Sequence, residues 1–129
     1  YNPRMSYSVA RNLFQASQIS ESELKQAQKV KQLAITRMRG LLPDGTLLCL
    51  PTTPFCAPKV GLPIDQTDSL REQISVLCCH GGLTGVPQVS IPGGTVGQDN
   101  APIGLSIVAG HNYDTDLLAV ALALESRHD

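Results

Sequence analysis

Two β-rich runs stand close together in the last third of the chain: GVPQVSIPG at residues 85–93 and PIGLSIVAG at residues 102–110. Pro87 and Pro92 bracket the centre of the first run, and because proline has no N–H, each suits a strand end rather than its middle. We therefore predict strands at residues 88–91 and 103–108, the second largely buried, paired as a hairpin with a long glycine-rich loop. Gly104 inside the second strand indicates a close approach to the backbone.

The segments on either side of this hairpin extend the same layered pattern. Residues 115–126 predict a last helix with Asp114 as its N-cap, and this helix is apolar nearly all round, so it needs cover on most sides. Residues 46–50 form a short apolar run, which predicts a strand covered on both faces. Residues 51–63 contain four prolines and predict a loop.

A helix is predicted at residues 70–80. Ser69 and Glu72 have the spacing of a capping box, in which a serine and a glutamate each bond the other's backbone N–H. Gly81 and Gly82 are expected to stop this helix.

A second helix is predicted at residues 21–41, with Ser20 and Glu23 as its capping box. Its apolar residues recur with the 3.6-residue period of one buried stripe. The stripe consists of Leu24, Ala27, Val30, Ala34, Met38 and Leu41. Residues 1–19 give weak signals, with a short helical turn at residues 9–14.

This order of helices and strands predicts an α/β or α+β layer arrangement. Three short strands make a small sheet with at least two open edges, whose unpaired backbone groups invite association. The open edges and the apolar last helix both indicate that further strands and cover come from a larger parent protein.

Composition excludes several function classes. The net charge is -1 and there is no Trp, so nothing favours nucleic acid, an anionic membrane or a stacking platform. No apolar run approaches the roughly 20 residues that span a bilayer. The cysteines Cys49, Cys56, Cys78 and Cys79 are expected to be reduced core thiols of a cytoplasmic protein.

Four motifs, taken in order, resemble the C-terminal part of the amidase-signature hydrolases. They are LLCLPTTP at residues 47–54, the two β-rich runs, and DTDLL at residues 114–118 with its helical tail. The resemblance covers residues 10–126. It implies an α/β fold in which this chain is part of a mixed β-sheet core flanked by helices, and it implies that residues 1–129 are the C-terminal portion of a single amidase domain.

The resemblance also implies a reaction. Members of this family hydrolyse carboxylic amides to an acid and ammonia or an amine with a Ser–Ser–Lys triad, in which a lysine base activates a serine nucleophile, and they need no metal or cofactor. This chain has no Ser-Ser pair, and Lys25, Lys29 and Lys31 lie on a charged helix face. No catalytic residue is therefore assigned, and the chain alone is expected to be inactive.

The loop after the predicted strand at residues 46–50 is the candidate binding segment. Ligands gather beyond the carboxyl ends of strands in open α/β sheets, and the equivalent loop in the family approaches the substrate cleft. Thr52, Thr53 and Phe55 are therefore candidate contacts for a small-molecule amide substrate, although the loop can equally serve only to turn the chain.

Two alternatives to an amidase segment stay open. The chain can be part of a glutamine amidotransferase subunit for tRNA-linked amidation, or a non-enzymatic truncated product that acts as a binding or self-association module. A homo-oligomer is also left open.

The cysteines and histidines do not form a recognisable metal-binding motif. Cys78, Cys79 and His80 are adjacent, whereas zinc sites need spaced pairs. His111 is read as a loop histidine and His128 as an exposed terminal one.

Overall fold

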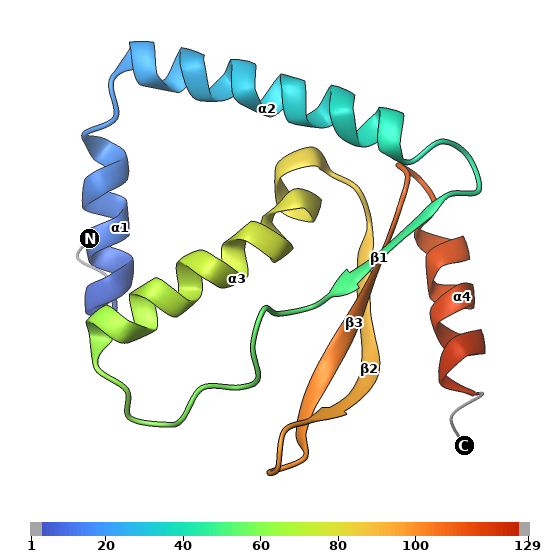
Figure 1. The fold of residues 1–129 in the computed structure, drawn as a ribbon. Coiled ribbons are helices and arrows are strands. Elements are labelled where there is room, and N and C mark those ends of the chain that lie inside the picture. The colour runs from blue at the N-terminus through green and yellow to red at the C-terminus, as the bar shows by residue number, and fades with distance from the viewer. Residues whose placement is uncertain (1–3, 127–129) are drawn as a thin grey trace. The chain divides into compact units, whose positions relative to one another are not determined.

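The computed structural model describes residues 4–126 of the chain, which divides after residue 33 into two compact units. The first unit contains α1 (Tyr7–Ser17) and the larger part of α2 (Glu21–Leu41). The second unit contains the end of α2, then β1 (Leu47–Pro51), α3 (Ile64–Thr84), β2 (Gln88–Val96), β3 (Ala101–Ala109) and α4 (Asp114–Glu125) (Figure 1).

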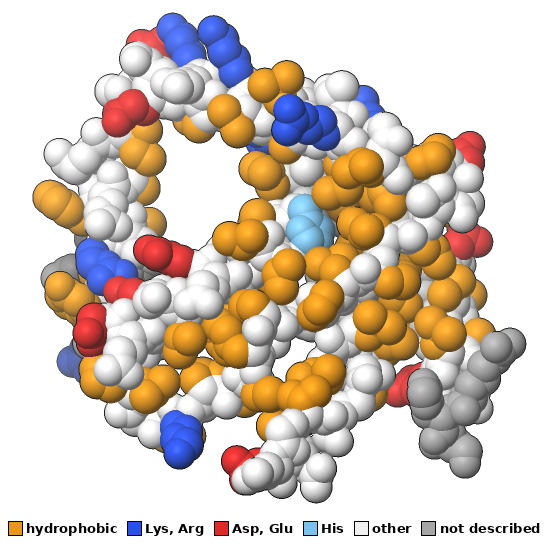
Figure 2. Space-filling view, in the orientation of Figure 1, with side chains coloured by type: hydrophobic (Ala, Val, Ile, Leu, Met, Phe, Trp, Pro, Cys, Tyr) orange, Lys and Arg blue, Asp and Glu red, His pale blue; other side chains and the backbone are white. Residues whose placement is uncertain are grey.

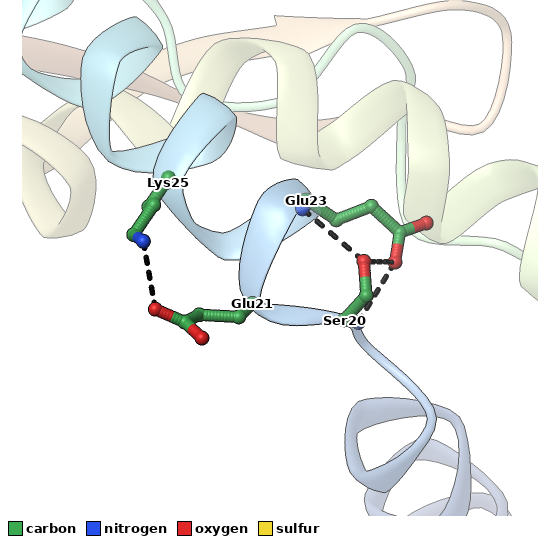
Figure 3. Close-up of polar contacts among 4 residues, drawn as sticks. All are labelled: Ser20, Glu21, Glu23 and Lys25. Atoms are coloured by element: carbon green, nitrogen blue, oxygen red, sulfur yellow. Dashed lines mark hydrogen bonds and ion pairs between the residues drawn. The ribbon is translucent and has the colours of Figure 1, made fainter.

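The start of α2 is fixed by the predicted capping box (Figure 3). Ser20 N donates to Glu23 Oε2 at 2.8 Å, and Glu23 N donates to Ser20 Oγ at 3.3 Å. The Ser20 hydroxyl also bonds Glu23 Oε2 at 2.6 Å, and these two hydrogen bonds to the carboxylate lower the pKa of Glu23. One turn on, Lys25 pairs with Glu21 at 2.7 Å. The predicted boundaries of 21–41 are confirmed.

The predicted burial of α2 is wrong. No residue of α2 is buried, and Leu24, Val30 and Leu41 are each at least half exposed. Only Met38, near the C-terminal end of the helix, packs against a core cluster. The apolar period is present in the sequence, but α1, the other described helix of the first unit, also lacks a buried residue, so the period alone does not predict burial. The predicted turn at residues 9–14 is a longer helix, α1.

The sheet of the second unit has the order β1-β3-β2, with both pairs antiparallel. β3 lies in the centre, and Ser106 to Ala109 are buried, as predicted for this strand. The β2–β3 hairpin is confirmed, although both strands are longer than predicted and a bulge lies between Pro92 and Gly94. β1 and β2 form the two edges, which agrees with the predicted open sheet.

The two faces of the sheet carry separate core clusters. On the first face, named here the Val108 face, Val108 packs with Leu42 and Val86. On the opposite face, Ile107 and Ala109 pack against Leu117 of α4. This division follows from the period-2 alternation of β3, which sends successive side chains to opposite faces.

β1 corrects the prediction of a strand covered on both faces. Leu47 and Leu48 are 41% and 39% exposed, and Cys49 is exposed as well. β1 is an edge strand of the sheet, and in the described structure only Leu50 of its side chains packs against a core cluster. The four cysteines are free, but Cys49 and Cys79 are exposed rather than in the core.

α3 is about twice as long as predicted, and both of its predicted boundaries are wrong. Ser69 lies inside the helix, which starts after Pro63, so Ser69 and Glu72 form no capping box. Gly81 and Gly82 continue the helix to Thr84. The stop comes at Gly85, whose φ of 77° is the left-handed conformation that glycine adopts readily, and Gly85 N donates to Gly81 O at 2.7 Å.

α4 has the predicted position but a different N-cap. Tyr113 occupies the cap position without a side-chain hydrogen bond to the helix, and Asp114 is the first helical residue. Leu117 and Ala121 are buried against the sheet, whereas Leu118 and Leu122 on the other side are 62% and 68% exposed. Figure 2 shows hydrophobic side chains spread over α4 and the adjoining sheet. The predicted need for cover is thus unmet among the described residues.

Candidate functional site

The predicted binding loop begins directly at the sheet. Thr52 N donates to Gly104 O at 2.9 Å, which extends the β1–β3 ladder one residue beyond the end of β1. Thr53 Oγ1 donates to Phe55 O at 2.7 Å and so closes a short turn. Thr52, Thr53 and Phe55 are all half-buried. The loop therefore has a fixed start, and its Thr52 side chain lies against the sheet.

Thr52 belongs to a cluster of hydroxyl groups that crosses all three strands. Its Oγ1 lies 2.6 Å from Ser90 Oγ on β2 and 2.9 Å from Ser106 Oγ on β3. Gln88 Nε2 donates to Ser106 Oγ at 3.0 Å. We name Thr52, Ser90, Ser106 and Gln88 the hydroxyl cluster.

The strand register explains why these side chains meet. Ser90 is paired directly with Ser106, and Gln88 lies two residues before Ser90 on the same face of β2. Leu50 is paired with Ser106 on the other side, so Thr52, two residues later, returns to the same face. The period of two along each strand places all four side chains on the Val108 face. This face thus carries the hydroxyl groups around Ser106, and Gln88 lies directly opposite Val108.

Gly104 forms the floor under the outer part of the hydroxyl cluster. A Cβ at this position would lie 2.6 Å from Thr52 Oγ1 and 2.7 Å from Ser90 Oγ, closer than packed atoms tolerate. The predicted close approach at Gly104 is therefore confirmed, and the groups that approach are two side-chain hydroxyls. Only a residue without a side chain lets Thr52 and Ser90 meet across β3.

Cys78 of α3 holds the loop from a third element. Its thiol donates to Thr52 O at 3.1 Å. Since Cys78 is half-buried and bonded to a carbonyl, its place in the structure is that of a loop support. Together with the Thr52 N–H bond to Gly104, this contact fixes both sides of the Thr52 backbone.

Sequence reasoning found Thr52 and Gly104 but missed Ser90, Ser106 and Gln88 as partners. Ser90 and Ser106 stand inside the two quoted β-rich runs, where a hydroxyl interrupts an otherwise apolar strand. Such an interruption on a buried strand is a signal, because a buried hydroxyl needs a partner. The pairing itself depends on the register, which the sequence does not state.

A second concave region lies near the β3–α4 connection. Met38, Leu42, Asp44, His111 and Tyr113 are among the residues that line a hollow of about 250 Å³. Burial raises the pKa of Tyr113, and the charge of Asp44 and its hydrogen bond with the Tyr113 hydroxyl raise it further.

The described histidines and lysines supply no recognisable catalytic group. His80 Nε2 and His111 Nε2 are both buried without a hydrogen-bond partner. In residues 4–126 no three His, Cys, Asp or Glu side chains gather as metal ligands, and His128 lies outside the described residues. The four lysines are exposed.

The hydroxyl cluster can do one kind of chemistry, which is to donate and accept hydrogen bonds without a change of charge. None of its side chains takes up a proton at ordinary pH, so the cluster by itself supplies no general base.

A separate observation concerns the helices. In the described part of the chain, no helix is both long and apolar enough to cross a membrane.

Comparison with known proteins identifies the family. The Amidase family profile matches residues 2–118, which is most of the chain. The chain belongs to the amidase family. A crystal structure of an amidase superposes with a TM-score of 0.74 at 21% identity, over 95% of this chain and 29% of that one. The α/β fold predicted from the resemblance is thereby confirmed.

Two relatives show how much of a family member this chain spans. It is 33% identical over 105 residues to a glutamyl-tRNA(Gln) amidotransferase subunit of Bacillus mycoides (strain KBAB4). The matched region covers 81% of this chain and 21% of that relative. It is 28% identical over 122 residues to amidase 1 of Arabidopsis thaliana. That matched region covers 95% of this chain and 28% of the relative. The chain thus spans between a fifth and three-tenths of the length of the proteins it matches.

Proposed function

We propose that residues 1–129 are the C-terminal portion of a single amidase domain, and that the complete domain hydrolyses carboxylic amides to an acid and ammonia or an amine. The observation that carries this proposal is the family match over residues 2–118, in a chain that corresponds to 29% of a solved amidase. Amide hydrolysis needs an activated nucleophile, a base and donors for the oxyanion. A Ser–Ser–Lys triad from the rest of the domain supplies them in this proposal.

The chain's own part is architectural and cleft-forming. β3 and its two neighbours supply sheet core, and the segment Thr52–Phe55 lines one wall of the substrate cleft. Support comes from the way this segment is held: Thr52 is fixed through its N–H, its carbonyl and its hydroxyl to three different elements. A wall held this firmly orients a substrate without rearranging, which is the property that positioning residues need.

Two experiments test the proposal. The first is intact mass with N-terminal sequencing of the native polypeptide, which is expected to extend several hundred residues before Tyr1 and to include a lysine and a Ser-Ser segment. The second is ammonia release from aliphatic amides by that polypeptide, which is expected to stop when the upstream serines become alanine. A native chain that begins near Tyr1 contradicts the proposal and makes a binding role the leading account.

A second candidate is supported by one specific comparison. The relative from Bacillus mycoides is named as one subunit of a glutamyl-tRNA(Gln) amidotransferase, so this chain can belong to the same type of subunit. Glutamine-dependent ammonia release that requires a co-purifying partner protein favours this candidate over a free-standing amidase. In either case we expect a cytoplasmic enzyme without metal or cofactor.

A further inference from the structure

The burial of Ser106 indicates which groups donate and which accept in the hydrogen bonds of the hydroxyl cluster. Ser106 is 0% exposed, so its hydrogen cannot go to water and needs an acceptor inside the protein. Of its two contacts in the described structure, Gln88 Nε2 is itself a donor and Thr52 Oγ1 is the acceptor. We therefore assign Ser106 as the donor to Thr52.

The same reasoning applies to the next link. Thr52 Oγ1 has two hydroxyl neighbours in the described structure, and Ser106 uses its own hydrogen on Thr52, so Ser90 Oγ at 2.6 Å is the acceptor that remains for the Thr52 hydrogen. We assign the bond in that direction. Ser90 then has a hydrogen left over, and Ser90 is exposed. The chain of bonds runs from Gln88 through Ser106 and Thr52 to Ser90, and it ends in a hydroxyl hydrogen that faces outward.

We propose that Ser90 is a substrate-positioning residue, whose outward hydroxyl donates a hydrogen bond to an oxygen acceptor on the amide substrate, at a point away from the bond that is cut. This inference rests on the proposed amidase function. A hydroxyl that has already accepted a hydrogen bond donates more strongly, so the cluster makes Ser90 a better donor than an isolated serine. Gly104 is what allows the arrangement, because any side chain there displaces Thr52 and Ser90.

The ligand class follows from the direction of the bonds. An outward donor on a neutral cluster selects a carbonyl or carboxylate oxygen and gives no advantage to a methyl group. Succinamate and butyramide make a matched pair, because they share a primary amide and differ in carrying a carboxylate or a methyl group at the other end.

The main test uses the polypeptide that contains this chain with the rest of its amidase domain. Ser90→Ala is expected to raise KM for succinamate about tenfold with little change in kcat, and to leave butyramide almost unchanged. Ser90→Thr keeps the hydroxyl and is expected to restore most of the loss. Thr95→Val is the matched control, because Thr95 is an exposed hydroxyl on the same strand outside the cluster.

A second variant tests the direction of the bonds without touching the substrate. Gln88→Glu replaces a donor to Ser106 with an acceptor, so Ser106 no longer has to donate to Thr52 and the Ser90 hydrogen is free to turn inward. We expect a rise in KM for succinamate of about threefold. The double variant with Ser90→Ala is expected to be no worse than Ser90→Ala alone, because both changes act on the same hydrogen bond.

The outcomes separate this inference from the function on which it rests. If the unmodified polypeptide hydrolyses neither amide, the proposed function fails and the inference falls with it. If it is active and Ser90→Ala behaves like Thr95→Val, the function stands and the inference is overturned. An equal loss on both substrates with a lower melting temperature also overturns it, since that pattern marks a structural role.

Discussion

Gly104 and Thr52 lie so close together that a Cβ on Gly104 would be 2.6 Å from Thr52 Oγ1. The backbone of the two residues is joined as well, because Thr52 N donates to Gly104 O at 2.9 Å. The start of the candidate binding loop thus lies directly against the central strand β3. The absence of a side chain at position 104 is what lets the Thr52 side chain lie this close to the sheet.

Gly104→Val is expected to destabilise the complete domain by about 1–3 kcal/mol or more, which is the usual range for overpacking a tight site. The three atoms nearest to the added Cβ belong to Thr52 and Ser90, and these side chains move only by breaking their hydrogen bonds. The measurement is the thermal melt and soluble yield of the complete domain.

Gly82→Ala is the matched control for that substitution. Gly82 lies inside α3 with nothing within 4 Å of its would-be Cβ, so alanine there is expected to stabilise by roughly 0.5–1 kcal/mol. Wild-type melting and solubility with valine at position 104 contradict the proposed close packing.

Several features of the fold could be predicted from local sequence. The capping box of Ser20 and Glu23 placed the start of α2 correctly, because both partners lie within four residues of each other. The β2–β3 hairpin was also predictable from its two β-rich runs, but Pro92 does not mark a strand end as predicted: it lies inside β2, at the bulge that interrupts the pairing with β3. Ser69 and Glu72 show the limit of such signals, since the same spacing occurs inside α3 with no capping role.

Burial could not be predicted in the same way, because it depends on what packs against each element. Leu24 and Val30 follow the apolar period of a buried helix face and are exposed. Leu48 reads as core and lies on an edge strand. The hydroxyl cluster was missed for a related reason: Thr52, Ser90 and Ser106 are up to 54 residues apart, and only the register brings them together.

Thr52→Val is expected to destabilise the complete domain by about 1–3 kcal/mol, because it leaves the hydrogen of the buried Ser106 hydroxyl without an acceptor. Thr52→Ser keeps the hydroxyl and is expected to cost much less. Denaturant unfolding of both variants, with Thr95→Val as the exposed control, measures the difference. Equal stability of the valine and serine variants at position 52 contradicts the direction of the bonds.

The start of α2 is expected to lose order in acid. The pKa of Glu23 is lower in the folded chain than the ordinary value, so its contribution is present above that ordinary value and disappears as the pH falls through the lowered one. The protection of the Glu23 and Leu24 amides, measured as their exchange rate relative to the unstructured rate at the same pH, is therefore expected to fall below about pH 4.5. Glu23→Gln can still accept from Ser20 N but does not titrate, so its exchange is expected to lack this acid step. An acid step that persists in the glutamine variant assigns the effect to another group.

The isolated chain of residues 1–129 is expected to melt without cooperativity or to aggregate. The outward side of α4 exposes Leu118 at 62% and Leu122 at 68%, and both β1 and β2 have unpaired edges in the described sheet. Exposed apolar surface next to open strand edges favours association over a single folded monomer. Calorimetry and sedimentation measure the outcome, and Leu118→Gln with Leu122→Gln is expected to raise the monomer fraction severalfold. A sharp two-state melt of a monomer argues against the chain being one portion of a larger domain, because its apolar faces then need no further cover.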